Sequence, residues 1–160
     1  MASTARGTRA SHSRLFAFLN PFMRLMLRLP FRRMHDRLLL LSFTGRTSGK
    51  RFTVPLSYVE ETDGSLLIPG GGSWKRNLVP GRPIDIRLRG RTRLATPDVI
   101  RDPAEVERLL PRLYSGNPQA RRFVGVPLGP DGRPDADQLA QALGDGFAIV
   151  RLRLVSEHGR

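Results

Sequence analysis

Short segments in which apolar and polar residues alternate recur along this chain, and turns rich in glycine and proline separate them. Residues 52–58 place an apolar side chain at every second position, and residues 84–88 repeat the pattern. A period of two is typical of strands with one buried face. Residues 38–43 are almost continuously apolar, as in a fully buried strand. Asp63-Gly64 is a hairpin turn signal, and residues 65–68 supply the returning strand. The chain is therefore expected to form an antiparallel sheet.

Two more strands and three short helices complete the predicted elements. The strands cover residues 92–96 and 147–155, and the basic residues of the second lead us to expect only partial burial for it. The helices are expected at residues 74–79, 103–114 and 136–143. Ser73 and Asp102 are candidate N-caps for the first two helices. These elements indicate an α+β domain built around a small antiparallel barrel or sheet.

Positive charge is concentrated in the first third of the chain. The 160 residues carry a formal net charge of +13, and residues 1–53 hold eleven Arg or Lys against one acid. The partner of this segment is therefore anionic: a nucleic acid, a lipid surface or a phosphorylated cofactor. Few aromatic residues accompany the basic ones, and no nucleic-acid-binding module is recognisable, which disfavours nucleic acid. The chain has no cysteine and its three histidines lack metal-ligand spacing, so we predict no metal site.

The first 35 residues are predicted to hold a tail and an amphipathic helix. Residues 1–12 are small, polar and basic, without apolar periodicity, and we expect them to be disordered. The predicted helix spans residues 13–35, and its residues 13–29 are mostly apolar apart from a narrow stripe that holds three arginines. This helix has two alternatives: it packs on the rest of a single domain spanning 13–160, or residues 13–33 lie on the inner face of the membrane. No run of about 18 uncharged apolar residues is present. We therefore expect a cytoplasmic protein.

Residues 44–51, which follow the first strand, have the composition of a phosphate cradle. The glycines allow backbone amides to converge on an anion, the hydroxyls add donors and the cations supply charge. A P-loop is excluded because three residues, not four, separate the glycines and a strand follows. The alternative is a solvated hairpin turn with a basic tip. The candidate anion-binding residues are Arg46, Thr47, Ser48, Gly49, Lys50 and Arg51.

Residues 70–77 form a second concentration of unusual residues. Three consecutive glycines permit a close approach of the backbone to a flat ligand, and the single tryptophan of the chain could form a wall of its site. An asparagine one helical turn later could orient a polar edge of the ligand. The alternative is a glycine-rich loop followed by a tryptophan that fills the core. The candidate ligand-binding residues are Trp74, Lys75, Arg76 and Asn77.

Together these segments resemble the deazaflavin-dependent nitroreductase family. The shared pattern is T-G-R-x-S-G, then Pro55-Leu56, then W-x-x-N-L, and the similarity extends over about residues 20–100. Members of this family are split β-barrel oxidoreductases that bind reduced coenzyme F420. The resemblance implies a small antiparallel split β-barrel here, with an N-terminal amphipathic helix and short helices between strands.

The resemblance also implies roles for the candidate residues. The phosphate and acidic tail of the cofactor would be approached by Arg46, Thr47, Ser48 and Lys50. The deazaflavin would be flanked by Pro55 and Leu56, and its pocket would be completed by Trp74 and Asn77. Thr47 and Phe52 stand where members of the family often carry basic residues. FMN and FAD are therefore alternative cofactors, and the alternative partners of an acidic tail are Lys50, Arg51, Lys75 and Arg76.

The function that these features favour is an F420H2-dependent reductase that transfers a hydride to a quinone, a nitroaromatic or an activated alkene. The protein then mainly positions donor and acceptor. Tyr114 lies roughly where the family places aromatic residues over the substrate, so it is the candidate catalytic residue, and Phe123 is a candidate lid. The alternative for Tyr114 is that it is the last apolar residue of its helix. Two other functions stay open: a non-catalytic carrier of a flavin, a deazaflavin or a haem-like ligand, and a basic nucleic-acid-binding protein. We expect a monomer or a homodimer.

Overall fold

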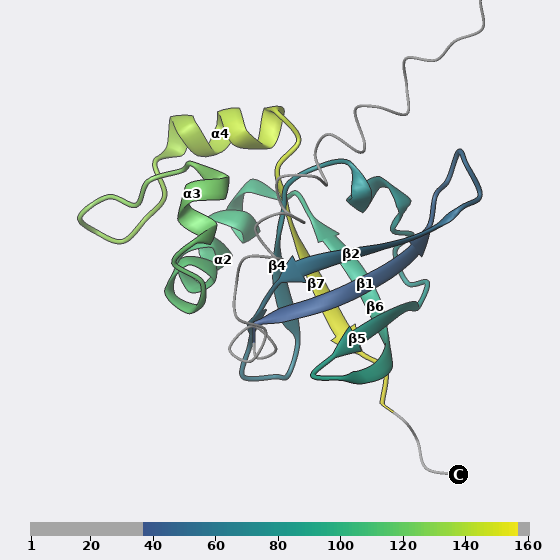
Figure 1. The fold of residues 1–160 in the computed structure, drawn as a ribbon. Coiled ribbons are helices and arrows are strands. Elements are labelled where there is room, and N and C mark those ends of the chain that lie inside the picture. Colours follow the sequence, from purple (N-terminus) through teal and green to yellow (C-terminus); the bar gives the residue numbers. More distant parts are fainter. Residues whose placement is uncertain (1–36, 157–160) are drawn as a thin grey trace, which may run out of the picture. The chain divides into compact units, whose positions relative to one another are not determined.

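The computed structural model describes residues 37–156 (Figure 1). The strands are β1 (Leu38–Thr44), β2 (Arg51–Ser57), β3 (Val59–Glu60), β4 (Leu66–Gly70), β5 (Ile84–Leu88), β6 (Arg91–Ile100) and β7 (Ala148–Leu154). The helices are the 3-10 helix η2 (Trp74–Asn77), α2 (Pro103–Gly116), α3 (Ala120–Val124) and α4 (Ala136–Gly144). The tail predicted at 1–12 and the helix predicted at 13–35, with its membrane contact, lie outside the described residues. Within the described part of the chain, no helix combines the length and apolarity needed to cross a bilayer.

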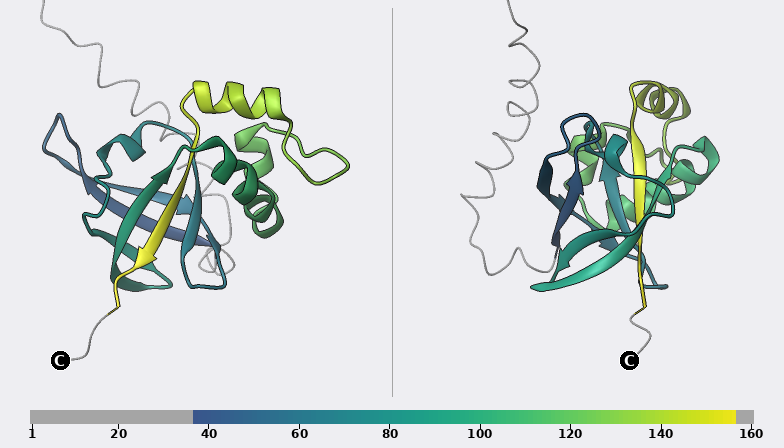
Figure 2. Two further views of the ribbon diagram at one scale, coloured as in Figure 1. Left: turned by 180° about the vertical axis from the view of Figure 1, so that it is seen from behind. Right: turned by 90° about the vertical axis from the view of Figure 1, so that its right-hand side faces the viewer.

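All seven strands belong to one antiparallel sheet with the order β2-β1-β5-β6-β7-β4-β3. The sheet bends until β2 comes back into contact with β4, which gives a half-barrel (Figure 2). The predicted antiparallel α+β architecture is therefore confirmed. Of residues 52–58, predicted as a single strand, all but Tyr58 lie in β2, which pairs with β1. After Tyr58 the chain continues into the short β3, which pairs with β4 across the Asp63-Gly64 turn.

The inner core fills the concave side of the half-barrel. Its members are alternate residues of successive strands, as the period of two requires. In β1, for example, Leu39 and Leu41 are fully buried while Leu40 is exposed. The buried residues of the inner core are Leu39, Leu41, Val54, Tyr58, Leu66, Ile68, Leu78, Ile86, Leu88, Ala95, Val150 and Leu152.

An outer core lies between the sheet and the helices α2, α3 and α4, which gather on one side of the half-barrel (Figure 1). The predicted N-cap of α2 is confirmed, because the Asp102 carboxylate accepts a hydrogen bond of 2.9 Å from the backbone N–H of Glu105. The helix α3 was not predicted: it has five residues, no side-chain cap, and ends at Gly125 in the left-handed conformation. The buried residues of the outer core are Leu67, Ile100, Val106, Leu109, Leu110, Leu113, Tyr114, Ala120, Val126, Leu139 and Ile149.

Two sequence-based expectations about local structure are wrong. The strand β7 was expected to be partly buried, yet it lies between β6 and β4 and its first five residues are buried. Its Arg151 is tolerated there because its guanidinium contacts Glu105 at 3.1 Å, Glu61 at 3.6 Å and Asp98 at 4.0 Å. Ser73 precedes η2 but its side chain makes no capping hydrogen bond, since its backbone is already helical.

Candidate functional site

The turn between β1 and β2 is a compact loop closed by its own backbone. The Gly45 N–H donates to the Lys50 carbonyl at 2.8 Å, and the Gly49 N–H donates to the Gly45 carbonyl at 2.8 Å. A Cβ at Gly45 would lie 2.6 Å from the Ser48 hydroxyl and 2.7 Å from the ring of Phe52, so these two side chains would have to shift. The predicted glycine-rich turn therefore has a fixed shape, and residues 46–50 of it are exposed.

Asn77 connects this turn to η2. Its Oδ1 accepts a hydrogen bond of 2.9 Å from the backbone N–H of Arg46, and its Nδ2 donates to the Trp74 carbonyl at 3.1 Å. The basic turn and the Trp-x-x-Asn segment are 31 positions apart in the sequence at this contact. One side chain therefore brings the two segments that the sequence analysis singled out into one place.

The cations of the turn differ in how free they are to bind a ligand. Arg51 donates to Asp85 on β5 at 2.7 Å, which engages part of its charge. Within residues 37–156, Arg46 and Lys50 form no ion pair. Thr47 is exposed beside them. Exposed, unneutralised cations next to backbone amides favour an anion such as a phosphate.

Three apolar candidates occupy different positions around this turn. Leu56 and Trp74 are half-buried and pack against the inner core. Pro55 is buried in β2 opposite Leu40 of β1, and the alternation of the strand directs its side chain away from that of Leu56. Leu56 and Trp74 therefore both lie on the inner-core side of the sheet, and the Pro55 side chain lies on the other side.

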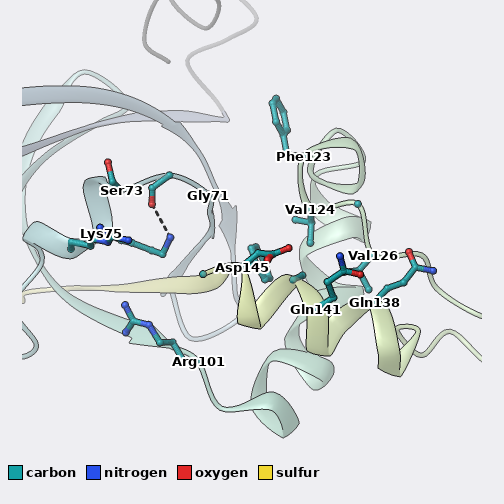
Figure 3. A pocket seen from close by; sticks show the side chains of 16 residues that line it. Gly71, Ser73, Lys75, Arg101, Phe123, Val124, Val126, Gln138, Gln141 and Asp145 are labelled. Carbon is teal, nitrogen blue, oxygen red and sulfur yellow. Dashed lines mark hydrogen bonds between the residues drawn. The ribbon is translucent and has the colours of Figure 1, made fainter. Parts of the chain in front are cut away.

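A cavity of about 640 Å³ adjoins η2 and the glycine-rich loop that precedes it (Figure 3). One wall holds Lys75 and Arg101, and the helical side holds Val124, Val126 and Gln141. The complete lining is Gly71, Gly72, Ser73, Lys75, Arg76, Arg101, Phe123, Val124, Gly125, Val126, Gln138, Gln141, Ala142, Asp145, Gly146 and Phe147. This volume lies in the range of small-molecule sites.

Lys75 is the one lysine among the cavity residues, and its side chain is 7% exposed. Its ammonium donates a hydrogen bond of 2.8 Å to the Gly72 carbonyl. Burial lowers the pKa of Lys75, and the nearby guanidinium groups of Arg101 and Arg76 lower the pKa further. The cavity therefore contains a cation that its surroundings do not neutralise.

Tyr114 lies apart from the cavity and the basic turn. It belongs to the outer core, 5% exposed, and its hydroxyl donates a hydrogen bond of 2.8 Å to the Val126 carbonyl. Burial raises the pKa of its phenol, although the bond to Val126 and the nearby Arg121 act in the opposite direction. Tyr114 lines a separate, smaller cavity of about 260 Å³. Phe123, the candidate lid, does line the larger cavity and is 64% exposed.

The helical wall of the cavity is the part of the site that sequence reasoning missed. Gln138, Gln141 and Asp145 come from α4 and its end, and Arg101 comes from the residue before the α2 N-cap. Polar residues on a short amphipathic helix carry no signal that separates them from a solvated face. Only the folded chain brings the α4 residues opposite Lys75 and Arg101 next to it.

No family model matches the chain, and no curated protein is similar enough in sequence to count as a relative. Among solved structures, the protein Atu2129 of unknown function from Agrobacterium tumefaciens str. C58 is similar, with 19% identity and a TM-score of 0.54. The match covers 97% of this chain and 60% of that chain, so this chain spans less than two thirds of Atu2129. The similarity is one of fold.

Two further solved structures have lower TM-scores. The F420-H2 dependent reductase FDR-A has 18% identity and a TM-score of 0.48, with 74% of this chain and 94% of that chain covered. The haem storage protein HutZ from Vibrio cholerae has 16% identity and a TM-score of 0.43, with 86% and 91% covered.

Proposed function

We propose that this chain is an F420H2-dependent oxidoreductase that transfers a hydride to a quinone, a nitroaromatic or an activated alkene. The observation that carries the proposal is the hydrogen bond from the Arg46 N–H to Asn77 Oδ1. It joins the two segments whose sequences resemble the deazaflavin-dependent nitroreductase family. A shared pattern in two separate segments has more weight when both lie at one site.

The basic turn fits the anionic part of such a cofactor. Arg46 and Lys50 would hold its phosphate and acidic tail, because both are exposed and form no ion pair within the described residues. The Ser48 hydroxyl and the backbone amides of Thr47 and Ser48 would add donors, since the amides of Gly45, Arg46, Gly49 and Lys50 already donate to other groups. FMN and FAD also carry phosphates, so they are the alternative ligands of the same turn.

The remaining residues would position the reactants. When bound, the deazaflavin supplies the hydride. Trp74 and Leu56 offer an apolar surface to a flat ring, and Asn77 holds η2 against the turn. The cavity beside η2 and the glycine-rich loop before it offers room for the acceptor. Catalysis by such a site comes mainly from holding two reactants in contact and excluding water.

The first experiment is a titration of the purified protein with F420, FMN and FAD, followed by Trp74 fluorescence. We expect F420 to bind more tightly than either flavin, and reduced F420 to be oxidised when menadione is added. The double variant Arg46→Gln/Lys50→Gln should bind F420 at least about tenfold more weakly, since each charge-assisted hydrogen bond contributes about 1.5–3 kcal/mol. The matched control, Arg87→Gln/Arg93→Gln, removes two exposed cations from the sheet. Absence of F420 binding would overturn the proposal.

A non-catalytic carrier of a flavin, a deazaflavin or a haem-like ligand is the second candidate function. A carrier needs no catalytic hydroxyl, and the Tyr114 hydroxyl, predicted to serve the substrate, is already bonded to the Val126 carbonyl. A carrier would bind its ligand stoichiometrically and show no turnover with quinones, nitroaromatics or activated alkenes. The cytoplasmic location, the membrane contact and the choice between monomer and homodimer stay predictions.

A further inference from the structure

The cavity beside η2 has one strongly cationic wall, formed by Lys75, Arg76 and Arg101. Asp145 is the single carboxylate among the residues that line this cavity. Asp102 follows Arg101 in the sequence, but its carboxylate is engaged as the N-cap of α2. The wall therefore has an excess of positive charge facing the cavity, which favours an anionic ligand.

Lys75 is the buried member of the cationic wall. An ammonium group has three N–H donors. The hydrogen bond to the Gly72 carbonyl uses one of them, and within residues 37–156 Lys75 forms no ion pair. A buried ammonium without a carboxylate partner is costly in free energy unless something compensates its charge. The lowered pKa of Lys75 expresses this same cost. A bound anion would supply the missing partner.

The opposite side of the cavity has a different character. Val124, Val126 and Phe147 are partly or fully buried apolar side chains. Gln138 and Gln141 add neutral amides from α4. A ligand that fits both sides has an apolar or aromatic body and one anionic group.

We propose that this cavity binds an aromatic carboxylate as the hydride acceptor, with Lys75 and Arg101 holding its carboxylate and the apolar side contacting its ring. The inference rests on the proposed function and narrows its acceptor class. With a nitrobenzoate, the nitro group gains a hydride and a proton and loses one oxygen as water, leaving a nitroso group. F420H2, which gives up the hydride and the proton, is oxidised to F420.

The test compares 4-nitrobenzoate with its methyl ester, which has the same ring and no charge. Binding is measured by calorimetry without cofactor, and KM is measured with F420H2. We expect wild type to bind the acid at least about tenfold more tightly than the ester, which corresponds to one charge-assisted hydrogen bond. Lys75→Met and Arg101→Gln should each remove most of that preference and leave the binding of the ester unchanged, and Arg101→Gln should also leave the binding of F420 unchanged.

Two further variants and measurements keep the result interpretable. Arg101 is exposed, so Arg101→Gln tests the subsite even where Lys75→Met reduces folding, which circular dichroism would report. Arg122→Gln is the control, because Arg122 is an exposed cation of α3 that does not line the cavity.

The outcomes separate the subsite from the cofactor. Equal affinity of wild type for the acid and the ester would overturn the inference. So would a loss of F420 affinity in Lys75→Met with the acid unaffected, because the anion held by the wall would then belong to the cofactor. Absence of F420 binding to wild type overturns the proposed function, whereas the acid preference, measured without cofactor, tests the anion subsite by itself.

Discussion

Replacement of Asn77 by alanine tests whether the basic turn and η2 act as one site. The substitution removes the bond from the Arg46 N–H at 2.9 Å and the bond to the Trp74 carbonyl at 3.1 Å. Each contributes about 0.5–1.5 kcal/mol in a typical protein, and Asn77 is half-buried, so we expect the free energy of unfolding to fall by about 1–2 kcal/mol. Urea unfolding followed by Trp74 fluorescence measures this change.

The same substitution should weaken cofactor binding. Without Asn77 the turn has lost its contact with η2 and must be ordered when the anion binds. Fixing the backbone of one residue costs about 1–2 kcal/mol, so the affinity for F420 should fall about five- to thirtyfold. The loss is expected without removal of any charge.

A matched control makes this prediction sharp. Gln119 is an exposed amide whose side chain makes no capping hydrogen bond to α3, so Gln119→Ala should change neither stability nor F420 affinity. If Asn77→Ala unfolds at the same urea concentration as wild type and binds F420 equally well, the Arg46–Asn77 bond does not organise the site. The reasoning above would then be refuted.

Three further predictions concern other parts of the structure. Tyr114→Phe should lower the free energy of unfolding by about 1–3 kcal/mol, because a buried hydrogen bond is lost, and should leave kcat/KM with menadione unchanged. A loss of turnover at unchanged stability would instead indicate that Tyr114 acts in catalysis. Gly70→Ala should lower the free energy of unfolding by about 1–3 kcal/mol, because the new Cβ would lie 2.5 Å from the Ala148 carbonyl oxygen. A Cβ at Gly71 meets nothing within 4 Å, so Gly71→Ala should be tolerated. Equal urea unfolding midpoints for the two variants would contradict this prediction. The pKa of Lys75 is lower in the folded chain than its ordinary value of 10.5, so just below pH 10.5 the folded chain binds fewer protons at Lys75 than the unfolded chain does. In this pH range the free energy of unfolding of wild type should therefore rise with pH relative to that of Lys75→Met. Parallel pH profiles of the two proteins would contradict this prediction.

Local features of the fold were predictable because they depend on neighbouring residues. A few adjacent side chains are enough to predict the alternation in residues 84–88 and the Asp102 cap of α2. The helix α3 lacks such signals, since it is a single short turn without a side-chain cap. The burial of β7 was missed because Arg151 suggests exposure, and the carboxylates that make its burial possible come from distant segments.

Two segments of the candidate site could be singled out from the sequence. Residues 44–51 and 70–77 stood out for their glycines, their cations and their resemblance to a family pattern, and the Arg46–Asn77 bond joins the two segments. The cavity beside η2 was not predicted, because one of its walls comes from α3 and α4. Arg101 becomes a candidate only once the sheet has placed it near Lys75, since a lone arginine before a helix cap is common on any surface.

The place of β7 in the sheet has a consequence for synthesis on the ribosome. β7 joins β6 to β4, so until residues 148–154 have emerged, β3 and β4 can pair only with each other. An isolated two-stranded hairpin is marginal in water. Meanwhile the apolar residues of β4, which belong to both cores, stay accessible to solvent and to other nascent chains. We therefore expect this domain to fold only after nearly all of its described residues have been translated.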